Sequence, residues 1–314
     1  MGKVILGIDT SNYTTSLSLM AESGELVANI KCPLPVAEGE RGLRQSDAVF
    51  AHVKNIPAVM KEMRNFICNN EICAVGVSSR PRNIEGSYMP CFLSGVALAE
   101  GIATSMSVPI YRFSHQCGHV MAAVYSSANF SILSKPFGAF HVSGGTTELL
   151  RIEGFSKHGF DVKLVGGTKD LNAGQIIDRI GVYMGLKFPA GPAMEELALS
   201  FRGKIPRKKP SVSGMEVNFS GLENLAKKLY DESGDKSLTS AFVFDYISRA
   251  ITLMCMGYEE KYGKSEFIFA GGVMSNSIIK RNLGQNFNSS FAIPAMSADN
   301  AVGIAYLTLN AHLM

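Results

Sequence analysis

The sequence predicts an α/β protein built from two similar halves, and three observations support this prediction. Apolar runs typical of strands alternate with amphipathic, helix-like segments along most of the chain. Residues 3–20 and 137–152 both have the pattern of a strand, a polar turn and a second strand, which suggests an internal duplication. The length of 314 residues suits two domains, or one duplicated unit, each with its own core.

The first half is expected to begin with a hairpin. The run "KVILGIDTSNYTTSLSLM" is rich in strand-forming residues and is interrupted by a polar tip at residues 10–15. A helix is expected over residues 45–67, because apolar residues such as Val49, Val53 and Met60 recur every three or four positions there. The apolar run "CAVGVSS" at residues 73–79 then predicts a buried strand.

The second half repeats this alternation. A second hairpin is expected over residues 137–152, and helices over residues 172–186 and 238–262. The run "EFIFAGG" predicts a strand that ends in glycines, and residues 274–283 predict the helix after it. Residues 297–313 predict the last helix.

Composition and charge exclude several classes of protein. Apolar residues make up 46% and charged residues 18%, which is typical of a globular chain. A net charge of +3 gives no global attraction to nucleic acid or membrane. The six cysteines form no C-x-x-C pair, which fits a reducing cytoplasm. No signal peptide or membrane span is expected, because the first apolar run ends in a polar turn and residues 89–110 are broken by glycine, serine and proline.

Two histidines four residues apart, His115 and His119, are the first candidates for chemistry. Positions i and i+4 lie on one face of a helix, so both imidazoles can reach a common metal ion. The alternative is a pair of ordinary helix histidines. The zinc-peptidase motif H-E-x-x-H is not matched, because Gln116 stands where that motif needs a glutamate base.

A divalent cation held by two imidazoles needs a third, anionic ligand from elsewhere in the chain. Asp299 in "MSADNAVG" is the best candidate. Its position at the expected start of the last helix also fits a helix cap, which is the commoner role for such a residue. Both roles stay open from the sequence alone.

Three glycine-containing turns follow or interrupt strands, in "VSGGTTEL", "FPAGP" and "FAGGVMSN". Glycines there would let main-chain N–H groups approach an anion. Together the turns suggest a nucleotide held between two lobes, although each alone is more often a plain tight turn. Neither a P-loop nor a G-x-G-x-x-G motif is present, so the phosphate cradle must be of another kind.

The run "FRGKIPRKKP" at residues 201–210 mixes prolines with five basic residues and is expected to be an exposed loop. Such runs are usually solvated surface. Contact with nucleic acid is the less favoured alternative.

Taken in order, these motifs resemble the TsaD (YgjD-like) family of tRNA N6-adenosine threonylcarbamoyltransferases, once described as O-sialoglycoprotein endopeptidases. The resemblance runs nearly end to end. It is carried by "ILGIDTS" at the start, "HQCGH" at 115–119, "HVSGGTTEL" at 141–149, "NAGQIIDRIGVYMGLKFPAGP" at 172–192, "NFSGLENLAKK" at 218–228, "FAGGVMSNSIIKRNL" at 269–283 and "SADNAVGIAY" at 297–306.

The resemblance implies the actin-like ATPase fold, with two duplicated ribonuclease H-like lobes and a ligand cleft between them. Residues 1–112 would form the N-terminal lobe, with residues 297–314 packing back on it. Residues 113–296 would form the C-terminal lobe.

The resemblance also implies the site residues. Iron or zinc would be held by His115, His119 and Asp299. ATP or threonylcarbamoyl-adenylate would be bound by the main chain of residues 141–145, by Asp178 at the ribose, and by Gly191 and Asn276. These cofactor-binding positions are His141, Val142, Ser143, Gly144, Gly145, Asp178, Gly191 and Asn276.

The implied reaction passes the threonylcarbamoyl group from its adenylate to the exocyclic amine of the adenosine beside the tRNA anticodon. The implied partners are an adenine nucleotide, tRNA and protein subunits similar to TsaB and TsaE, in the cytoplasm and without a membrane. A bound cation can polarise the carbamoyl carbonyl, and two lobes can position the weak amine nucleophile.

Some positions depart from the family pattern. Asn12 and Tyr13 stand where the family usually carries an acidic pair, which leaves Asp9 and Asn12 as the catalytic candidates. Arg80 and Arg82 replace small residues after the third strand. These departures favour one alternative, a divergent or non-catalytic paralogue that binds ATP and a partner subunit. A metallopeptidase is the third hypothesis, and Gln116 argues against it.

Overall fold

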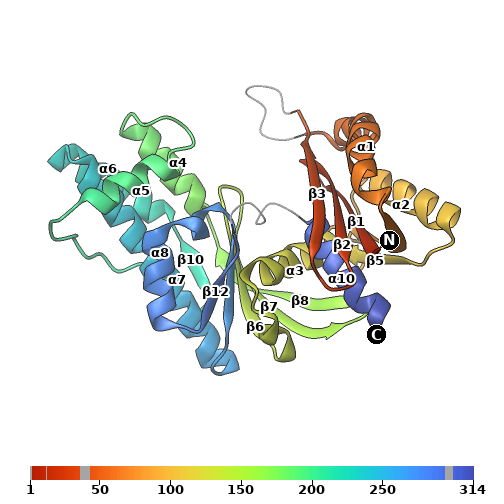
Figure 1. The fold of residues 1–314 in the computed structure, drawn as a ribbon. Helices are drawn as coiled ribbons and strands as arrows, with labels where there is room; N and C mark the ends of the chain where they lie inside the picture. Colours follow the sequence, from red (N-terminus) through yellow and green to blue (C-terminus); the bar gives the residue numbers. More distant parts are fainter. Residues whose placement is uncertain (1, 12, 36–42, 294–299) are drawn as a thin grey trace. The chain divides into compact units, whose positions relative to one another are not determined.

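The computed structural model describes residues 2–11, 13–35, 43–293 and 300–314. The chain divides into two compact units. Unit 1 comprises Met1–Phe130, Glu153–Val162 and Ala298–Met314, and unit 2 comprises Ser131–Ile152 and Lys163–Ser297. Each unit contains a mixed β-sheet and α-helices, so the predicted α/β class is confirmed (Figure 1).

The sheet of unit 1 has five strands in the order β3-β2-β1-β4-β5. Their bounds are β3 Leu26–Pro33, β2 Thr14–Ala21, β1 Gly2–Ser11, β4 Asn70–Arg80 and β5 Ile110–Ser114. The predicted hairpin is confirmed, because β1 and β2 pair antiparallel in a register that ends at Ser11 opposite Thr14. Strands β4 and β5 continue the sheet in parallel.

Helices cover both faces of this sheet. Helices α1 (Gln45–Ile67) and α2 (Phe92–Met106) pack on one face, where a core of aliphatic side chains includes Leu6, Ile8 and Val75. Helix α10 (Ala301–Leu313) packs on the other face, against β1, β2 and β4, beside α3 (His115–Ser127). The helix predicted over residues 45–67 is confirmed with the same bounds.

Helix α3 belongs to unit 1, although the sequence-based boundary lay before it, between residues 112 and 113. The physical reason is its close packing against α10. A Cβ atom on Gly303 would lie 1.9 Å from the Gly118 carbonyl oxygen, so the two helix backbones can approach this closely only because position 303 lacks a side chain.

The sheet of unit 2 has seven strands in the order β12-β11-β6-β7-β8-β10-β9. Their bounds are β12 Ser289–Phe291, β11 Phe267–Ala270, β6 Phe137–Val142, β7 Thr147–Ser156, β8 Gly159–Thr168, β10 Glu216–Asn218 and β9 Ser211–Ser213. The predicted second hairpin is confirmed as β6 and β7. Strand β11 pairs in parallel with β6 and β12, as β4 does with β1 and β5, so the strand order of unit 1 recurs and supports the duplication.

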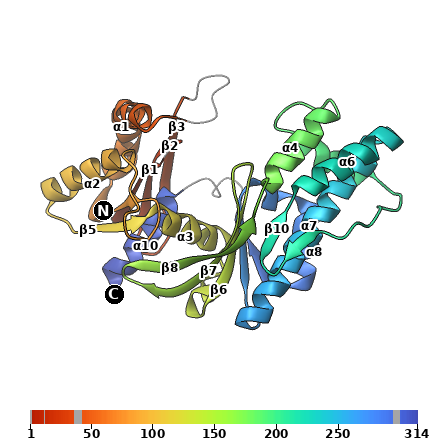
Figure 2. The same ribbon diagram turned by 180° about the vertical axis from the view of Figure 1, so that it is seen from behind.

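The hairpin formed by β7 and β8 is long, and its end at Glu153–Val162 is grouped with unit 1 (Figure 2). There the Asn83 side-chain amide donates to the Phe160 carbonyl at 3.0 Å. The Cys117 thiol of α3 lies 3.6 Å from the same carbonyl oxygen.

The helices of unit 2 are α4 Ala173–Tyr183, α5 Gly191–Ser200, α6 Ser220–Ser233, α7 Lys236–Tyr262 and α8 Ser277–Asn286. Short 3-10 turns occur at Phe130–Ser134 and Gly272–Ser275. Helix α7 is long and apolar enough to cross a membrane, but 72% of its apolar window is buried inside the protein. It therefore has the environment of a core helix, and its aromatic residues Phe242, Phe244 and Tyr258 fill the largest core cluster.

Candidate metal and nucleotide sites

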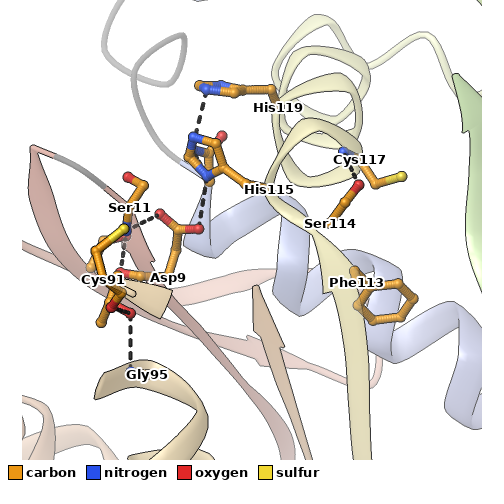
Figure 3. A network of polar contacts seen from close by, with 12 residues as sticks. Asp9, Ser11, Cys91, Gly95, Phe113, Ser114, His115, Cys117 and His119 are labelled. Atoms are coloured by element: carbon orange, nitrogen blue, oxygen red, sulfur yellow. Dashed lines mark hydrogen bonds and ion pairs between the residues drawn. The ribbon is translucent and has the colours of Figure 1, made fainter. Parts of the chain in front are cut away.

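Helix α3 presents His115 and His119 on one face, as their spacing predicts (Figure 3). The helix follows β5 directly, and the Ser114 hydroxyl caps it by accepting from the Cys117 N–H at 3.2 Å. The centroids of the two imidazole rings are 4.5 Å apart. The cap therefore fixes the first turn of α3, where His115 is the first residue.

Asp9, at the end of β1, is the charged partner of His115 (Figure 3). Its Oδ1 lies 2.9 Å from His115 Nδ1, and its Oδ2 accepts from the Ser11 N–H at 3.3 Å. Burial alone would raise the pKa of Asp9, but the charge and hydrogen bond of His115 and the bond from Ser11 lower that pKa to about 2. Asp9 is therefore ionised at neutral pH and is a poor general base.

The contact with Asp9 selects one tautomer of His115. An ionised carboxylate can only accept, so Nδ1 of His115 carries a proton and donates to Asp9; in the neutral form of the ring the lone pair is then on Nε2. A carboxylate behind an imidazole is the usual outer partner of a metal-binding histidine, because it fixes the ring and increases its basicity. The arrangement makes Asp9 an orienting residue.

Asn300, immediately before α10, lies against both histidines. Its side-chain nitrogen is 2.8 Å and 3.1 Å from the two ring nitrogens of His115, and 3.3 Å from Nε2 of His119. Its side-chain oxygen is buried without a hydrogen-bond partner among the described residues. A half-turn of the Asn300 carboxamide would exchange its nitrogen and oxygen and place the oxygen, a possible metal ligand, beside both imidazoles. Two nitrogens and one oxygen then suit a divalent cation.

Two of the predicted residues lie outside the described part of the chain, namely Asn12 and Asp299. Within the described part, no group of three or more His, Cys, Asp or Glu side chains could hold a metal ion. Asn300 occupies the N-cap position of α10, and its side chain makes no capping hydrogen bond. The role of Asp299 as third ligand or cap therefore stays a prediction.

Glycines allow α10 to bring Asn300 to this place. A Cβ atom on Gly7 of β1 would lie 2.4 Å from the Ala301 carbonyl oxygen. A Cβ atom on Gly303 would collide with the backbone of α3 at Gly118, as described above. The start of α10 therefore fits between the strand that carries Asp9 and the helix that carries the histidines.

His52 of α1 supports the hairpin end next to Asp9. Its Nδ1 lies 2.8 Å from the Thr15 hydroxyl, and its Nε2 lies 2.8 Å from the Ser11 carbonyl oxygen. A carbonyl can only accept, so Nε2 carries the proton and Nδ1 accepts from Thr15. His52 is fully buried, and it was not predicted from the sequence, because no local motif marks it.

The stability of unit 1 is expected to fall as His52 becomes protonated. Burial lowers the pKa of His52 below 6.5, although the Ser11 carbonyl and the charge of Asp9 act in the opposite direction. Between the two pKa values the unfolded chain binds more protons, so the stabilisation is complete above the unfolded value and is lost as the pH falls. The free energy of unfolding in urea should drop as the pH falls below about 6.5.

In the variant His52→Gln the free energy of unfolding should drop less as the pH falls, because glutamine can still donate to the Ser11 carbonyl and does not titrate. The matched control is His312→Gln in α10, which should keep the wild-type pH dependence. Equal pH slopes for wild type and His52→Gln would contradict the expectation.

Unit 2 contains a pocket of about 350 Å³, within the usual range for small-molecule sites. It contains four of the predicted cofactor-binding residues, Gly144, Asp178, Gly191 and Asn276. Its apolar surface comes from Ile177, Phe244, Val273, two prolines and four glycines, and its other polar groups come from Glu195 and Ser275.

The turn between β6 and β7 forms one wall of this pocket. The Ser143 hydroxyl accepts from the N–H groups of Gly145 and Thr146 at 3.3 Å and 3.1 Å. The Gly174 N–H at the start of α4 donates to the Ser143 carbonyl at 3.2 Å. A Cβ atom on Gly144 would meet no atom within 4 Å, so the space above this turn is open to a ligand.

The turn after β11 forms a second wall. Gly271 has a φ of 99°, and a Cβ atom there would lie 2.3 Å from the Val142 carbonyl oxygen, so only glycine fits. Asn276 caps α8 by accepting from the N–H groups of Ile278 and Ile279. This leaves its side-chain NH₂ group as a donor toward the pocket, where the helix N-terminus also favours negative charge.

Two carboxylates complete the pocket. Asp178 Oδ1 accepts from the Ala190 N–H at 2.8 Å, which ties α4 to the turn before α5. Glu195 Oε1 accepts from the N–H and hydroxyl of Ser277, at 2.7 Å and 2.5 Å. Glu195 was not predicted from the sequence, where its only signal is its place one turn after Gly191.

The other predicted cofactor-binding residues do not line the pocket. His141 and Val142 are inside β6 and pair with residues of β7, and the Val142 side chain is fully buried. Ser143 and Gly145 belong to the turn, but only Gly144 of that turn lines the pocket.

A family model described as TsaD, tRNA N6-adenosine threonylcarbamoyltransferase, matches residues 38–306. The chain therefore belongs to the TsaD family. This family is one of transferase enzymes, which confirms the resemblance drawn from the motifs.

Relatives of the same description cover nearly the whole chain. A tRNA N6-adenosine threonylcarbamoyltransferase of Carboxydothermus hydrogenoformans is 27% identical over 97% of this chain and 91% of its own length. The Riemerella anatipestifer protein of that name is 28% identical over 96% of this chain and 91% of its length. The Jannaschia protein is 29% identical over 98% of this chain and 88% of its own length.

Solved structures show the fold of this TsaD-family chain. The activator of the 2-hydroxyisocaproyl-CoA dehydratase from Clostridium difficile is similar with a TM-score of 0.53 at 11% identity, over 99% of this chain and 96% of its own. A ROK family glucokinase from Streptomyces griseus gives 0.52 at 12% identity, over 98% of both chains. A full-length HypF has a TM-score of 0.58 at 11% identity, over 98% of this chain and 55% of its own length. The predicted actin-like ATPase fold is confirmed.

Proposed function

We propose that this TsaD-family chain transfers the threonylcarbamoyl group from threonylcarbamoyl-adenylate to N6 of the adenosine beside the tRNA anticodon. The observation that carries the proposal is the pairing of Asp9 with His115, because it builds the kind of oriented imidazole that binds a metal ion. The family description and the pocket of unit 2 support the same reaction.

The pocket of unit 2 is the proposed site of the adenylate. Gly144 and Gly272 leave space for close approach of an anion to the main chain, and the Asn276 NH₂ group can donate at the start of α8, where its oxygen accepts from the Ile279 N–H. Asp178 keeps one carboxylate oxygen on the Ala190 N–H, and its other oxygen can accept from a ribose hydroxyl. Ile177 and Phe244 offer an apolar surface to the base.

The proposed cation site of unit 1 consists of His115, His119 and Asn300, with Asp299 as the anionic ligand expected from the family. Its donor set suits iron, zinc or manganese. When bound, such an ion supplies Lewis acidity toward carbonyl and phosphate oxygens. Asp9 holds a proton on Nδ1 of His115 and so favours the tautomer in which Nε2 is unprotonated, as a metal ligand must be.

The proposed reaction is balanced without an oxidant or a covalent enzyme intermediate. The N6 amine forms a bond to the carbamoyl carbon, the bond from that carbon to the phosphate oxygen breaks, and AMP leaves. The amine loses one proton to solvent or to the leaving phosphate, because Asp9 has too low a pKa to hold it.

A transfer assay with threonylcarbamoyl-adenylate that is labelled in its threonine part tests the proposal. The purified chain, unmodified tRNA, adenylate and TsaB- and TsaE-like subunits should give labelled tRNA. Tight ATP binding without any transfer would instead support the non-catalytic paralogue. We also propose that the TsaB- and TsaE-like subunits are partners of this chain and that it acts in the cytoplasm.

Nucleotide binding is expected to weaken when a methyl group is added inside the pocket. A Cβ atom at Gly144 or Gly272 would meet no protein atom within 4 Å, so Gly144→Ala and Gly272→Ala should fold normally. The added methyl groups would occupy the space of the anion, and the Kd for the adenylate should rise by about ten-fold. Calorimetric titration measures this change.

The matched control is Gly221→Ala in α6, which also has open space at Cβ but does not line the pocket. It should bind the adenylate like wild type. An unchanged Kd in Gly144→Ala and Gly272→Ala would place the nucleotide elsewhere.

A further inference from the structure

The loop between α5 and β9 concentrates the positive charge of the protein. Residues 202–209 include five basic residues and no acidic residue. The whole chain carries +3, so subtracting these five charges leaves −2 on all other residues. A nearly neutral protein therefore has one short, strongly basic segment.

The main chain of this loop is fixed to the core of unit 2. Ile205, in its middle, packs against the core cluster. The Arg249 guanidinium donates to the Lys208 carbonyl at 2.8 Å, and the Ser211 N–H donates to the Tyr246 hydroxyl at 3.2 Å. Both partners are on α7, the central helix of unit 2. The loop is thus held on a rigid support.

The basic side chains have no carboxylate partners in the described part of the chain, although the Arg202 guanidinium donates to the Leu199 and Phe201 carbonyls at 2.6 Å and 3.2 Å. Arg202, Lys204, Arg207, Lys208 and Lys209 are all exposed. In the described residues, none of them forms an ion pair with a carboxylate. A stretch of eight residues spans at most ~25 Å, which is long enough to meet several successive phosphates of a nucleic acid.

We propose that the loop of residues 202–209 binds the phosphate backbone of the tRNA substrate. The proposal rests on the proposed function, which supplies tRNA as the polyanion. The loop itself argues against a membrane surface, because no large apolar side chain between residues 202 and 209 is exposed for insertion. Exposed cations without a carboxylate partner among the described residues, on a main chain held by α7, instead match the sequence-independent contacts that position a nucleic acid.

The test compares tRNA binding by wild type and by the triple variant Arg207→Gln, Lys208→Gln, Lys209→Gln. Each lost phosphate contact should reduce the salt dependence of the affinity, so the slope of log K against log salt should decrease in magnitude by about 2. At about 0.1 M salt the affinity should fall by about ten-fold or more. Adenylate binding should not change, because none of the three residues lines the pocket.

The matched control removes three exposed charges from α1, as Lys54→Gln, Lys61→Gln, Arg64→Gln. It changes the net charge equally and should keep wild-type tRNA affinity and salt slope. An equal loss of tRNA affinity in both triple variants would overturn the proposal, because it would show a general effect of net charge. Loop-dependent binding to vesicles with anionic lipid, without loop-dependent tRNA binding, would also overturn it.

The same samples separate the loop from the proposed function. If wild type and the loop variant bind and modify tRNA equally, the loop proposal fails and the transferase function stands. If wild type neither binds nor modifies tRNA in the presence of its partner subunits, both fail.

Discussion

His119→Ala is expected to lose the bound metal and to transfer threonylcarbamoyl at a rate lower by on the order of 10³-fold. The imidazole of His119 is one of the two that meet at the Asn300 side chain, and alanine offers no replacement donor. The fold should persist, because His119 is a partly exposed residue of α3. Elemental analysis and the transfer assay on the same sample measure both effects.

His158→Ala is the matched control, since His158 is exposed at the turn between β7 and β8. It should keep wild-type metal content and activity. Asp299→Ala tests the third expected ligand in the same way, and a loss of metal would distinguish a ligand from a helix cap. Full metal content and activity in His119→Ala would refute the proposed cation site.

Gly303→Ala is expected to destabilise unit 1 by about 3 kcal/mol. The new methyl carbon would lie 1.9 Å from the Gly118 carbonyl oxygen and 2.8 Å from the Ala122 nitrogen. Both atoms belong to the backbone of α3, so relief requires the two helices to move apart. Differential scanning calorimetry should show a midpoint lower by roughly 6–12 °C.

Gly303→Ala should also reduce metal binding, because α10 carries Asn300 to the histidines. The control is Gly101→Ala in α2, where a Cβ atom meets nothing within 4 Å. Removing a helix glycine there should stabilise the fold by about 0.5–1 kcal/mol. An unchanged midpoint for Gly303→Ala would contradict the tight packing of α3 on α10.

Local patterns predicted most of the secondary structure. Spacing along the chain predicted α1 with its observed bounds, and alternation with a polar tip predicted both hairpins. The last helix was predicted to begin at residue 297, whereas α10 begins at Ala301. The helix predicted over residues 172–186 is shorter, Ala173–Tyr183, because it ends before Gly185, which has a φ of 79°.

Part of the candidate site was also visible in the sequence. The spacing of His115 and His119 places them on one helix face, and the glycine turns pointed to Gly144, Gly191 and Asn276 in the pocket. Glu195 and His52 could not be found in this way. Each contacts residues far away in the chain, Ser277 and Thr15, and no short motif reports such a contact.

The sequence by itself determined the family, the order of the elements and the helix face shared by the two histidines, because these depend on motifs and on spacing within one element. The tertiary structure decided that Asp9 pairs with Nδ1 of His115 and that Asn300 meets both rings, across 106 and 185 residues of chain. It also decided that α3 belongs to unit 1. These features depend on how closely separate elements pack, which is set here by the backbone contact at Gly118 and Gly303 and not by any local pattern.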